Sequence, residues 1–264
     1  VDLICPRVFD DKVLKETYWE DFVDGAANDI PLMIGLGSGE MDFISYRAEN
    51  VPATPEQIVQ KMLAHYKPAG ECPGQIQPYG NEELINKFME KGGDKVKKAL
   101  DLYAAFATGI GTYKYAAAQS KYRNTYLYIW DWMPDANALT QPKFESTFSP
   151  YGRSVHCAEL PVLWNSGNIG YEALSHWWMM YFEDQEFNKL SKEIVPHELA
   201  VKTAMTWYTF AKTGNPNNDL IPYWPPFDPE TRPAMNMALD WAVKKEWAIE
   251  DLDILMEIDP TPVK

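Results

Sequence analysis

Apolar residues fall into two kinds of pattern along this chain, short continuous runs and longer stripes with helical spacing. Two of the runs, residues 30–35 (IPLMIG) and 125–130 (TYLYIW), predict strands that are buried on both faces. Pro31 suits only the start of the first strand, because proline has no N–H to donate within a sheet. Runs of this kind are typical of parallel sheets, whose two faces are covered by helices.

Stripes of apolar residues spaced three and four apart predict helices. Residues 54–57 (TPEQ) combine an N-cap threonine, a proline in the first turn and a glutamine that closes a capping box, so a helix is expected to begin there. A second helical region is expected from Asn81. A glycine pair (92–93) interrupts it, Asp94 restarts it, and Gly109 is expected to end it.

The later part of the chain adds three more elements. Residues 176–182 (HWWMMYF) predict a buried helix, and residues 198–212 predict an amphipathic helix that Gly214 closes. The proline-rich stretch 224–233 predicts an extended segment. No internal repeat or low-complexity linker separates these elements, so we expect one unit spanning residues 1–264.

Composition narrows the class of protein. Hydrophobic residues make up 46% of the chain and aromatic residues 14%, which is typical of a packed globular protein. The formal net charge of −14 argues against a nucleic-acid partner and against an anionic membrane surface, because both require a basic face. No uncharged apolar run approaches the length of about 18 residues that a membrane-spanning helix needs.

The cysteines and the N-terminus bear on where the protein acts. Cys5, Cys72 and Cys157 are scattered without C-x-x-C spacing, a pattern that favours neither a disulfide framework nor a zinc site. We therefore expect a reducing, cytoplasmic setting. The first residues, VDLICP, lack the basic flank and apolar core of a signal peptide, and they lack an initiator methionine. We expect the chain to begin partway through a longer protein.

Residue chemistry alone offers few candidates for a site. The four histidines are His65, His156, His176 and His197, and no pair has the spacing of metal ligands. No glycine-rich phosphate loop is present, so neither a metal nor a cofactor is expected. A single histidine usually has a structural or surface role. On this basis the chain is an acidic α/β domain without an assigned activity.

Four segments, in order along the chain, resemble those of type B carboxylesterases and cholinesterases. Residues 24–35 (DGAANDIPLMIG), followed by Ser38-Gly39-Glu40, are similar to the segment that carries the acid of that family, and residues 154–161 (SVHCAELP) to the segment that carries its histidine. Residues 207–217 (WYTFAKTGNPN) and 224–233 (WPPFDPETRP) resemble its C-terminal helix and the segment after it.

The resemblance implies the C-terminal part of an α/β-hydrolase fold, helix-rich, with the last strands of a mainly parallel sheet. The two strands at 30–35 and 125–130 would be the penultimate and last ones, and both catalytic groups would follow the carboxyl ends of strands. The order Ser…Glu…His of such hydrolases is obeyed by Glu40 and His156. His156 would act as general base, and Glu40 would orient its ring.

Neighbouring residues leave alternatives to these roles. The sequence departs from the D-E-G that is usual at the acid, with Gly39 before Glu40 and Met41 after it, so Asp42 is a second candidate acid. When the end of the strand at 30–35 is aligned with the family's segment, Glu40 falls at the position of the acid, so Glu40 is favoured over Asp42. Glu159 is expected to position the histidine loop. Cys157 is not expected to be a nucleophile paired with His156, because adjacent side chains in an extended loop point apart. It is expected to pack in the core instead.

The nucleophile of such a triad is missing from this sequence. It contains neither G-x-S-x-G nor an H-G-G oxyanion loop, and Ser154 lies in a near-match, GRSVH, that no predicted strand precedes. We expect a missing N-terminal half or a second chain to supply the serine, so this chain alone should be inactive towards small-molecule esters. Without that half it should also self-associate. The alternative is a non-catalytic, cholinesterase-like interaction module.

Overall fold

The computed structural model describes residues 10–12, 15, 17–42, 53–65, 82–133, 149, 151–164, 195–245 and 252–257. The aromatic run 176–182, Cys5, Cys72 and His176 lie outside the described residues. No helix in the described part of the chain has the length and apolar character needed to cross a membrane.

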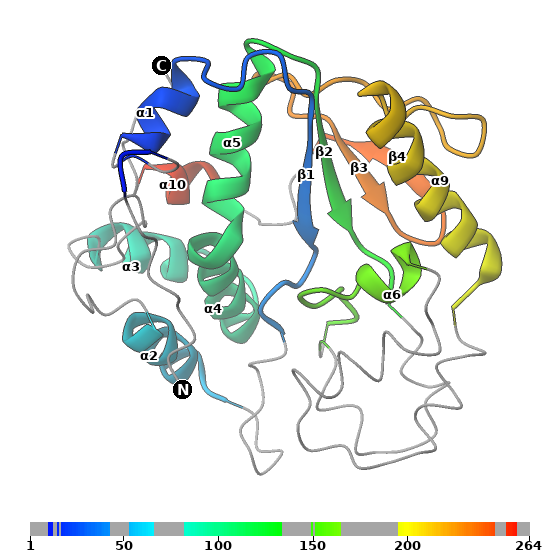
Figure 1. Cartoon of the computed structure of the whole chain (residues 1–264). Coiled ribbons are helices and arrows are strands. Elements are labelled where there is room, and N and C mark those ends of the chain that lie inside the picture. Colours follow the sequence, from blue (N-terminus) through cyan, green and yellow to red (C-terminus); the bar gives the residue numbers. More distant parts are fainter. Residues whose placement is uncertain are drawn as a thin grey trace.

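A four-stranded sheet forms the centre of the molecule (Figure 1). Its strands are β1 (Leu32–Gly37), β2 (Thr125–Trp130), β3 (Ala234–Met237) and β4 (Trp241–Lys244), in that spatial order. The first three strands run parallel, with Leu32 opposite Thr125 and Leu127 opposite Ala234, and β4 pairs antiparallel with β3. The prediction of a mainly parallel sheet containing both apolar runs is therefore confirmed.

Two details of the sheet correct the sequence interpretation. The first strand spans Leu32–Gly37 instead of 30–35, and Ile30 is 59% exposed ahead of it. The run at 125–130 is also not the last strand, because β3 and β4 follow it. The sequence AMNM of β3 has little of the β-branched or aromatic character that marks a strand. It forms a strand through its pairing with β2 on one side and β4 on the other.

Helices cover both faces of the sheet, as Figure 1 shows for α5 (Ile110–Ser120) on one side and α9 (His197–Thr213) on the other. Strand β2 alternates between them with the period of two of a pleated strand. Tyr126 and Trp130 pack in the cluster that contains Leu199 of α9, whereas Leu127 and Ile129 pack with the alanines of α5. Burial of each such side chain stabilises the fold by about 1.5–3 kcal/mol.

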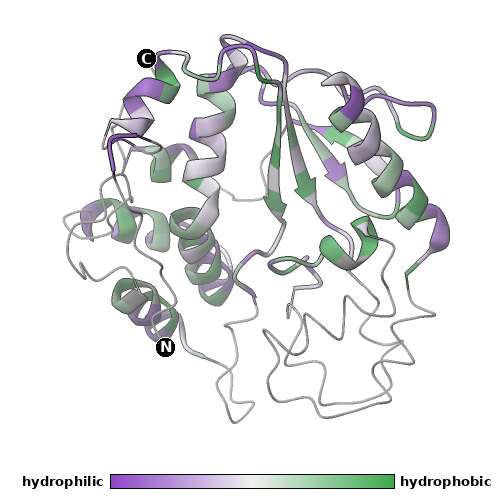
Figure 2. Cartoon of the chain, in the orientation of Figure 1, coloured by the Kyte–Doolittle hydropathy of each residue, from purple (hydrophilic) through white to green (hydrophobic). Residues whose placement is uncertain are grey.

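A second, helical core lies beside α5. It is built from α2 (Pro55–His65), α3 (Glu82–Glu90), α4 (Lys95–Ala104) and α10 (Leu252–Met256), with α1 (Tyr18–Val23) nearby. Its fully buried members include Met62, Phe88, Leu100 and Leu255. The amphipathic character of these helices is visible in Figure 2, where green and purple alternate around each ribbon.

Local hydrogen bonds explain where two of these helices begin. Thr54 and Gln57 form the expected capping box, in which the Thr54 amide donates to Gln57 Oε1 at 3.0 Å and the Gln57 amide donates to Thr54 Oγ1 at 3.4 Å. Asp94 caps α4 by accepting from the amides of Val96 and Lys97. The helix starts predicted at Thr54 and Asp94 are therefore confirmed.

The expected helix end at Gly109 is wrong. A π-helix (Ala105–Gly109) follows α4, and its last residue has a right-handed φ of −62°, so the chain continues directly into α5. The Ile110 amide donates to the carbonyl of Ala105, five residues back, which is the bond of a π-turn. By contrast, Gly214 adopts a φ of 73° and ends α9 in the left-handed region, as its type predicts.

The proline-rich stretch after α9 runs without regular structure to β3, as predicted. Asn217 holds its start, accepting from the Trp224 amide at 2.7 Å and donating to the Trp224 carbonyl at 2.9 Å. The Phe227 amide donates to the carbonyl of Thr125 at 2.7 Å, which aligns the segment with the start of β2. The segment thereby places β3 beside β2, on the side of β2 opposite to β1.

Candidate active site

Two segments meet at the carboxyl ends of β1 and β2. The first is the turn at residues 38–42, and the second is the segment 151–159. Backbone bonds hold them side by side. The Gly39 amide donates to the Ser154 carbonyl at 2.8 Å, and the His156 amide donates to the Glu40 carbonyl at 3.1 Å. In addition, Ser38 Oγ accepts from the Ser154 amide at 3.0 Å. Ligands of open α/β sheets bind at this end of the strands.

The structure brings Glu40 and His156 together at this junction. Oε1 of Glu40 contacts Nδ1 of His156, while Oε2 accepts from the Gly37 amide at 2.6 Å. Both carboxylate oxygens are therefore engaged, and only 4% of Glu40 is exposed. The His156 side chain is 36% exposed. Because Glu40 binds Nδ1, the other ring nitrogen, Nε2, lies on the far side of the ring.

The pKa of His156 is raised to about 10 by a hydrogen bond with the Cys157 side chain, followed by the hydrogen bond with Glu40. This contact corrects the expectation that Cys157 points away into the core. The segment is a turn and not an extended loop, and Cys157 has a φ of 63°, in the left-handed region that non-glycine residues rarely adopt. Its free thiol is only partly buried and lies beside the imidazole. Both contacts favour the protonated form of the imidazole.

Further acidic and phenolic groups surround the pair. Burial raises the pKa of Glu159, and the negative charge of Glu40 raises it further. Burial likewise raises the pKa of Tyr128, with Glu159, Glu40 and Cys157 contributing in the same direction. Glu159 also lies at the N-terminal boundary of α6 (Leu160–Leu163), where its carbonyl accepts from the amide of Leu163 at 2.8 Å. Of the groups around the ring, Cys157 and Glu40 are those that raise the pKa of His156, and burial of the ring opposes them.

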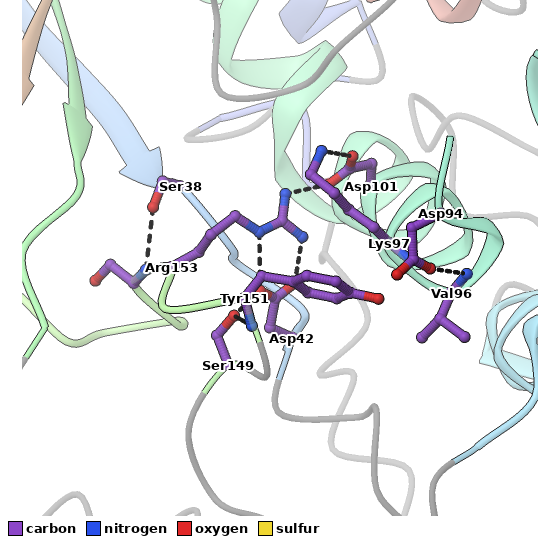
Figure 3. Close-up of polar contacts among 10 residues, drawn as sticks. Ser38, Asp42, Asp94, Val96, Lys97, Asp101, Ser149, Tyr151 and Arg153 are labelled. Carbon is purple, nitrogen blue, oxygen red and sulfur yellow. Dashed lines mark hydrogen bonds and ion pairs between the residues drawn. The ribbon is translucent and has the colours of Figure 1, made fainter. Parts of the chain in front are cut away.

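Asp42, the second candidate acid, takes other partners. Its two oxygens accept from Arg153, with Nε to Oδ2 at 2.9 Å and Nη2 to Oδ1 at 2.6 Å, and the Ser149 hydroxyl also donates to Oδ2 (Figure 3). Burial raises the pKa of the Asp42 carboxyl despite these bonds. Since both oxygens accept from a guanidinium, we assign the ionised form in this pairing. Asp42 is occupied, whereas Glu40 faces the imidazole.

The departure from D-E-G at Gly39 has a steric cause. A Cβ at this position would lie 2.6 Å from Cβ of Arg153 and still closer to the carboxylate of Asp42. Only glycine leaves room for the Asp42–Arg153 pair between the two segments. Gly39, Asp42 and Arg153 therefore form one arrangement that replaces the usual residues around the acid.

The remaining sequence candidates lie elsewhere or are buried. Ser154 is completely buried, and its hydroxyl has no hydrogen-bond partner among the described residues. His197 is exposed at the start of α9, and the His65 side chain lies outside the described residues. Within the described ranges, no group of three or more His, Cys, Asp or Glu side chains is placed to hold a metal ion.

Sequence reasoning missed the two contacts that characterise this site, those of Cys157 with His156 and of Arg153 with Asp42. The partners in the second contact are 111 residues apart, so no local pattern signals it. The one sequence signal at this place was the unusual Gly39, whose lack of a side chain leaves space that Arg153 and Asp42 occupy in the structure.

Comparison with known proteins gives consistent results. The model of the carboxylesterase family matches residues 3–254. A para-nitrobenzyl esterase of Bacillus subtilis (strain 168) is 26% identical across 99% of this chain and 42% of its own length. A liver carboxylesterase of Sus scrofa is 23% identical across 85% of this chain and 36% of its own length. The chain thus spans less than half the length of these relatives.

Solved structures extend the likeness to the fold. A PNB esterase matches with a TM-score of 0.57 at 20% identity, covering 92% of this chain and 41% of its own. A carboxylesterase of Geobacillus stearothermophilus matches with a TM-score of 0.53 at 17% identity, covering 86% of this chain and 40% of its own. The partly parallel sheet with helices on both faces is part of an α/β-hydrolase fold.

Proposed function

This chain belongs to the carboxylesterase family, and from that premise we propose that it supplies the acid and the histidine of a Ser-Glu-His triad to a carboxylic-ester hydrolase. The contact between Glu40 Oε1 and His156 Nδ1, at the carboxyl ends of β1 and β2, is the observation that carries the proposal. An oriented imidazole whose Nδ1 is held by a buried carboxylate is the acid–base unit of such triads.

The chemistry assigns one task to each group. His156 accepts the proton of the serine hydroxyl at Nε2 as the serine oxygen attacks the ester carbonyl, and then donates that proton to the leaving alkoxide. A water molecule then releases the acyl group by the same steps in reverse. Glu40 keeps the ring in the tautomer that presents Nε2 to the serine, and stabilises the imidazolium that forms at each step.

The serine and the oxyanion hole are proposed to come from a segment that this sequence does not contain. No G-x-S-x-G occurs in it, and it spans 42% and 36% of two curated relatives. Inactivity of the chain alone is proposed because triad chemistry has no covalent step without a nucleophile and an oxyanion hole. A small-molecule ester is the proposed substrate, and the cytoplasm the proposed location.

Hydrolysis of p-nitrophenyl acetate tests the proposal. The chain alone should not exceed a buffer control. Joined to the serine-bearing part of a carboxylesterase, or mixed with that part as a second chain, it should hydrolyse the ester. His156→Gln should then abolish most of that activity, while the matched change His197→Gln on the exposed start of α9 should not. A joined enzyme that folds but is inactive would favour the non-catalytic interaction module.

A further inference from the structure

Arg153 lies where three parts of the molecule meet (Figure 3). It belongs to the segment that carries His156, three residues before that histidine. Its guanidinium reaches Asp42, which is two residues after Glu40, through two hydrogen bonds of 2.9 and 2.6 Å. Its remaining amine, Nη1, donates to Oδ1 of Asp101 on α4 at 2.5 Å. One side chain therefore connects the acid turn, the histidine segment and a core helix.

The surroundings of Arg153 fix its position closely. The side chain is 12% exposed, and those of its partners Asp42 and Asp101 are 1% and 3% exposed. Burial alone lowers the pKa of Arg153, but its two carboxylate partners outweigh this effect and raise it. A planar guanidinium that binds both oxygens of one carboxylate sets the orientation of the partner as well as its distance. A lysine ammonium sets only the distance.

Neighbouring groups support this connection from both sides. Lys97 binds Oδ2 of Asp101 at 2.9 Å, so that Asp101 is held while its Oδ1 faces Arg153. The ring of Tyr151 lies 5.6 Å from the guanidinium carbon. Gly39, which has no side chain, leaves the space in which the Arg153 stem and the Asp42 carboxylate approach each other. The arrangement is built by residues from all three parts of the molecule.

We propose that Arg153 is the positioning residue of the Glu40–His156 pair. By binding Asp42 it fixes the turn after Glu40 against the segment before His156, and by binding Asp101 it fixes both to α4. It also keeps Asp42 away from the imidazole, so that Glu40 is the carboxylate that serves the ring. The catalytic part of this inference rests on the proposed function, whereas the positioning part concerns this chain alone.

The test measures how well His156 holds its proton in variants of the chain. The groups that face the ring are Glu40, Cys157 and Glu159. Exchange of the imidazole C2 hydrogen for deuterium, followed at several pH values by mass spectrometry of the peptide containing His156, gives the midpoint of its titration even if the chain associates. Arg153→Lys keeps the positive charge but cannot form the bidentate hydrogen bonds that Arg153 makes with the two oxygens of Asp42. Arg232→Lys is the matched control, because Arg232 pairs with Asp253 elsewhere, at 2.6 Å.

The positioning role predicts that the His156 midpoint falls in Arg153→Lys, towards the usual histidine value of 6.5, and stays unchanged in Arg232→Lys. An unchanged midpoint in Arg153→Lys, or an equal fall in both variants, would overturn the inference. If Arg153→Lys does not fold, the double variant Arg153→Lys, Asp101→Asn replaces it. In the double variant the lysine ammonium has a single buried carboxylate to neutralise, that of Asp42. The midpoint of the double variant is compared with that of Asp101→Asn alone, and the same fall is expected.

Activity of the joined enzyme separates this inference from the proposed function. If the joined enzyme hydrolyses p-nitrophenyl acetate, Arg153→Lys should lower kcat at least several-fold with little change in KM, since no contact with substrate is removed. If the joined enzyme is inactive, the proposed function fails, yet the midpoint of His156 still decides whether Arg153 positions the pair.

Discussion

Glu40 and His156 are 116 residues apart in the sequence, yet Oε1 of the one contacts Nδ1 of the other. The second oxygen of Glu40 is held by the Gly37 amide at 2.6 Å, so the carboxylate has little freedom to rotate away from the ring. A carboxylate fixed at the end of one strand therefore orients an imidazole that follows another.

Glu40→Gln tests this orientation. An amide in place of the carboxylate removes the negative charge that stabilises the imidazolium and can favour the wrong tautomer. We expect kcat of the joined enzyme towards p-nitrophenyl acetate to fall by about 10⁴-fold, the scale for replacing the acid of a serine triad by its amide. Asp42→Asn serves as a control for loss of a nearby charge and should cost much less. Equal losses in the two variants would contradict the assignment of Glu40.

Cys157→Ala should lower the pKa of His156, because a hydrogen bond with the Cys157 side chain is the largest contribution to raising it. The Glu40 contact remains, so the pKa should stay above that of an ordinary histidine. Deuterium exchange at C2 of His156 measures the change, and His197 in the same sample provides an internal reference. A midpoint that does not move would show that the thiol is turned away from the ring in solution.

The raised pKa of His156 also makes stability depend on pH. A histidine whose folded pKa is raised binds its proton more tightly in the folded state, so the stabilisation is full below the unfolded value of 6.5 and is lost as pH rises through about 10. The ring is 36% exposed, so solvent screening reduces the effect. We expect the free energy of unfolding to fall by about 1 kcal/mol between pH 6.5 and about pH 10. Urea unfolding at pH 6 and pH 10 measures it. His156→Gln should remove this component, and an equal pH dependence in the variant would contradict the prediction.

Arg153→Met should be strongly destabilising, because it leaves Asp42 and Asp101 buried without their shared cation. Removal of one partner from a buried ion pair typically costs about 3–5 kcal/mol. The triple variant Arg153→Met, Asp42→Asn, Asp101→Asn should recover much of that loss, since no uncompensated charge remains among the three residues. Arg232→Met, at a half-exposed pair, should cost about 1 kcal/mol or less. Thermal melts of Arg153→Met, the triple variant and Arg232→Met measure these differences in stability. A triple variant no more stable than Arg153→Met would contradict the prediction.

The isolated chain should self-associate through β1. This strand lies at an edge of the described sheet, paired only with β2 there, and Leu32, Met33 and Ile34 carry no charge to discourage pairing with another chain. Light scattering at increasing concentration should show a rising mean mass. Leu32→Lys should reduce this association, whereas Leu239→Lys, at a residue that is 55% exposed between β3 and β4, should not. A concentration-independent monomer would count against this prediction.

The sequence predicted those features that depend on local chemistry. The capping box at Thr54, the restart at Asp94 and the left-handed Gly214 each follow from the side chain or backbone freedom of the residue itself. Apolar runs predicted β1 and β2, because strands buried on both faces need continuous apolar character. Strand β3 could not be found in this way, since AMNM lacks the local character of a strand and forms one by pairing with β2 and β4.

The candidate site likewise contains residues that the sequence could predict and contacts that it could not. Glu40 and His156 could be found because the segments around them resemble those of a known family. The thiol beside His156 could not, because its position depends on a φ of 63° at Cys157 that no sequence pattern announces. Nor could the partner of Asp42, which is brought to it by the backbone bonds between residues 38–40 and 154–156.

The absence of a side chain at Gly39 restricts how this region can evolve. A change to the D-E-G that is usual at the acid cannot begin at position 39, because a new side chain would collide with Arg153 and Asp42. Nor can the change begin with loss of Arg153, because Asp42 and Asp101 would then be buried without their shared cation. Replacement of Asp42 comes first, since it removes one of the two contacts and leaves Arg153 paired with Asp101. Cβ of Arg153 would still lie 2.6 Å from a Cβ at position 39, so Arg153 also has to change or shift before position 39 can carry a side chain. Positions 39, 42 and 153 should therefore covary among descendants of this chain, with changes at 42 preceding those at 39.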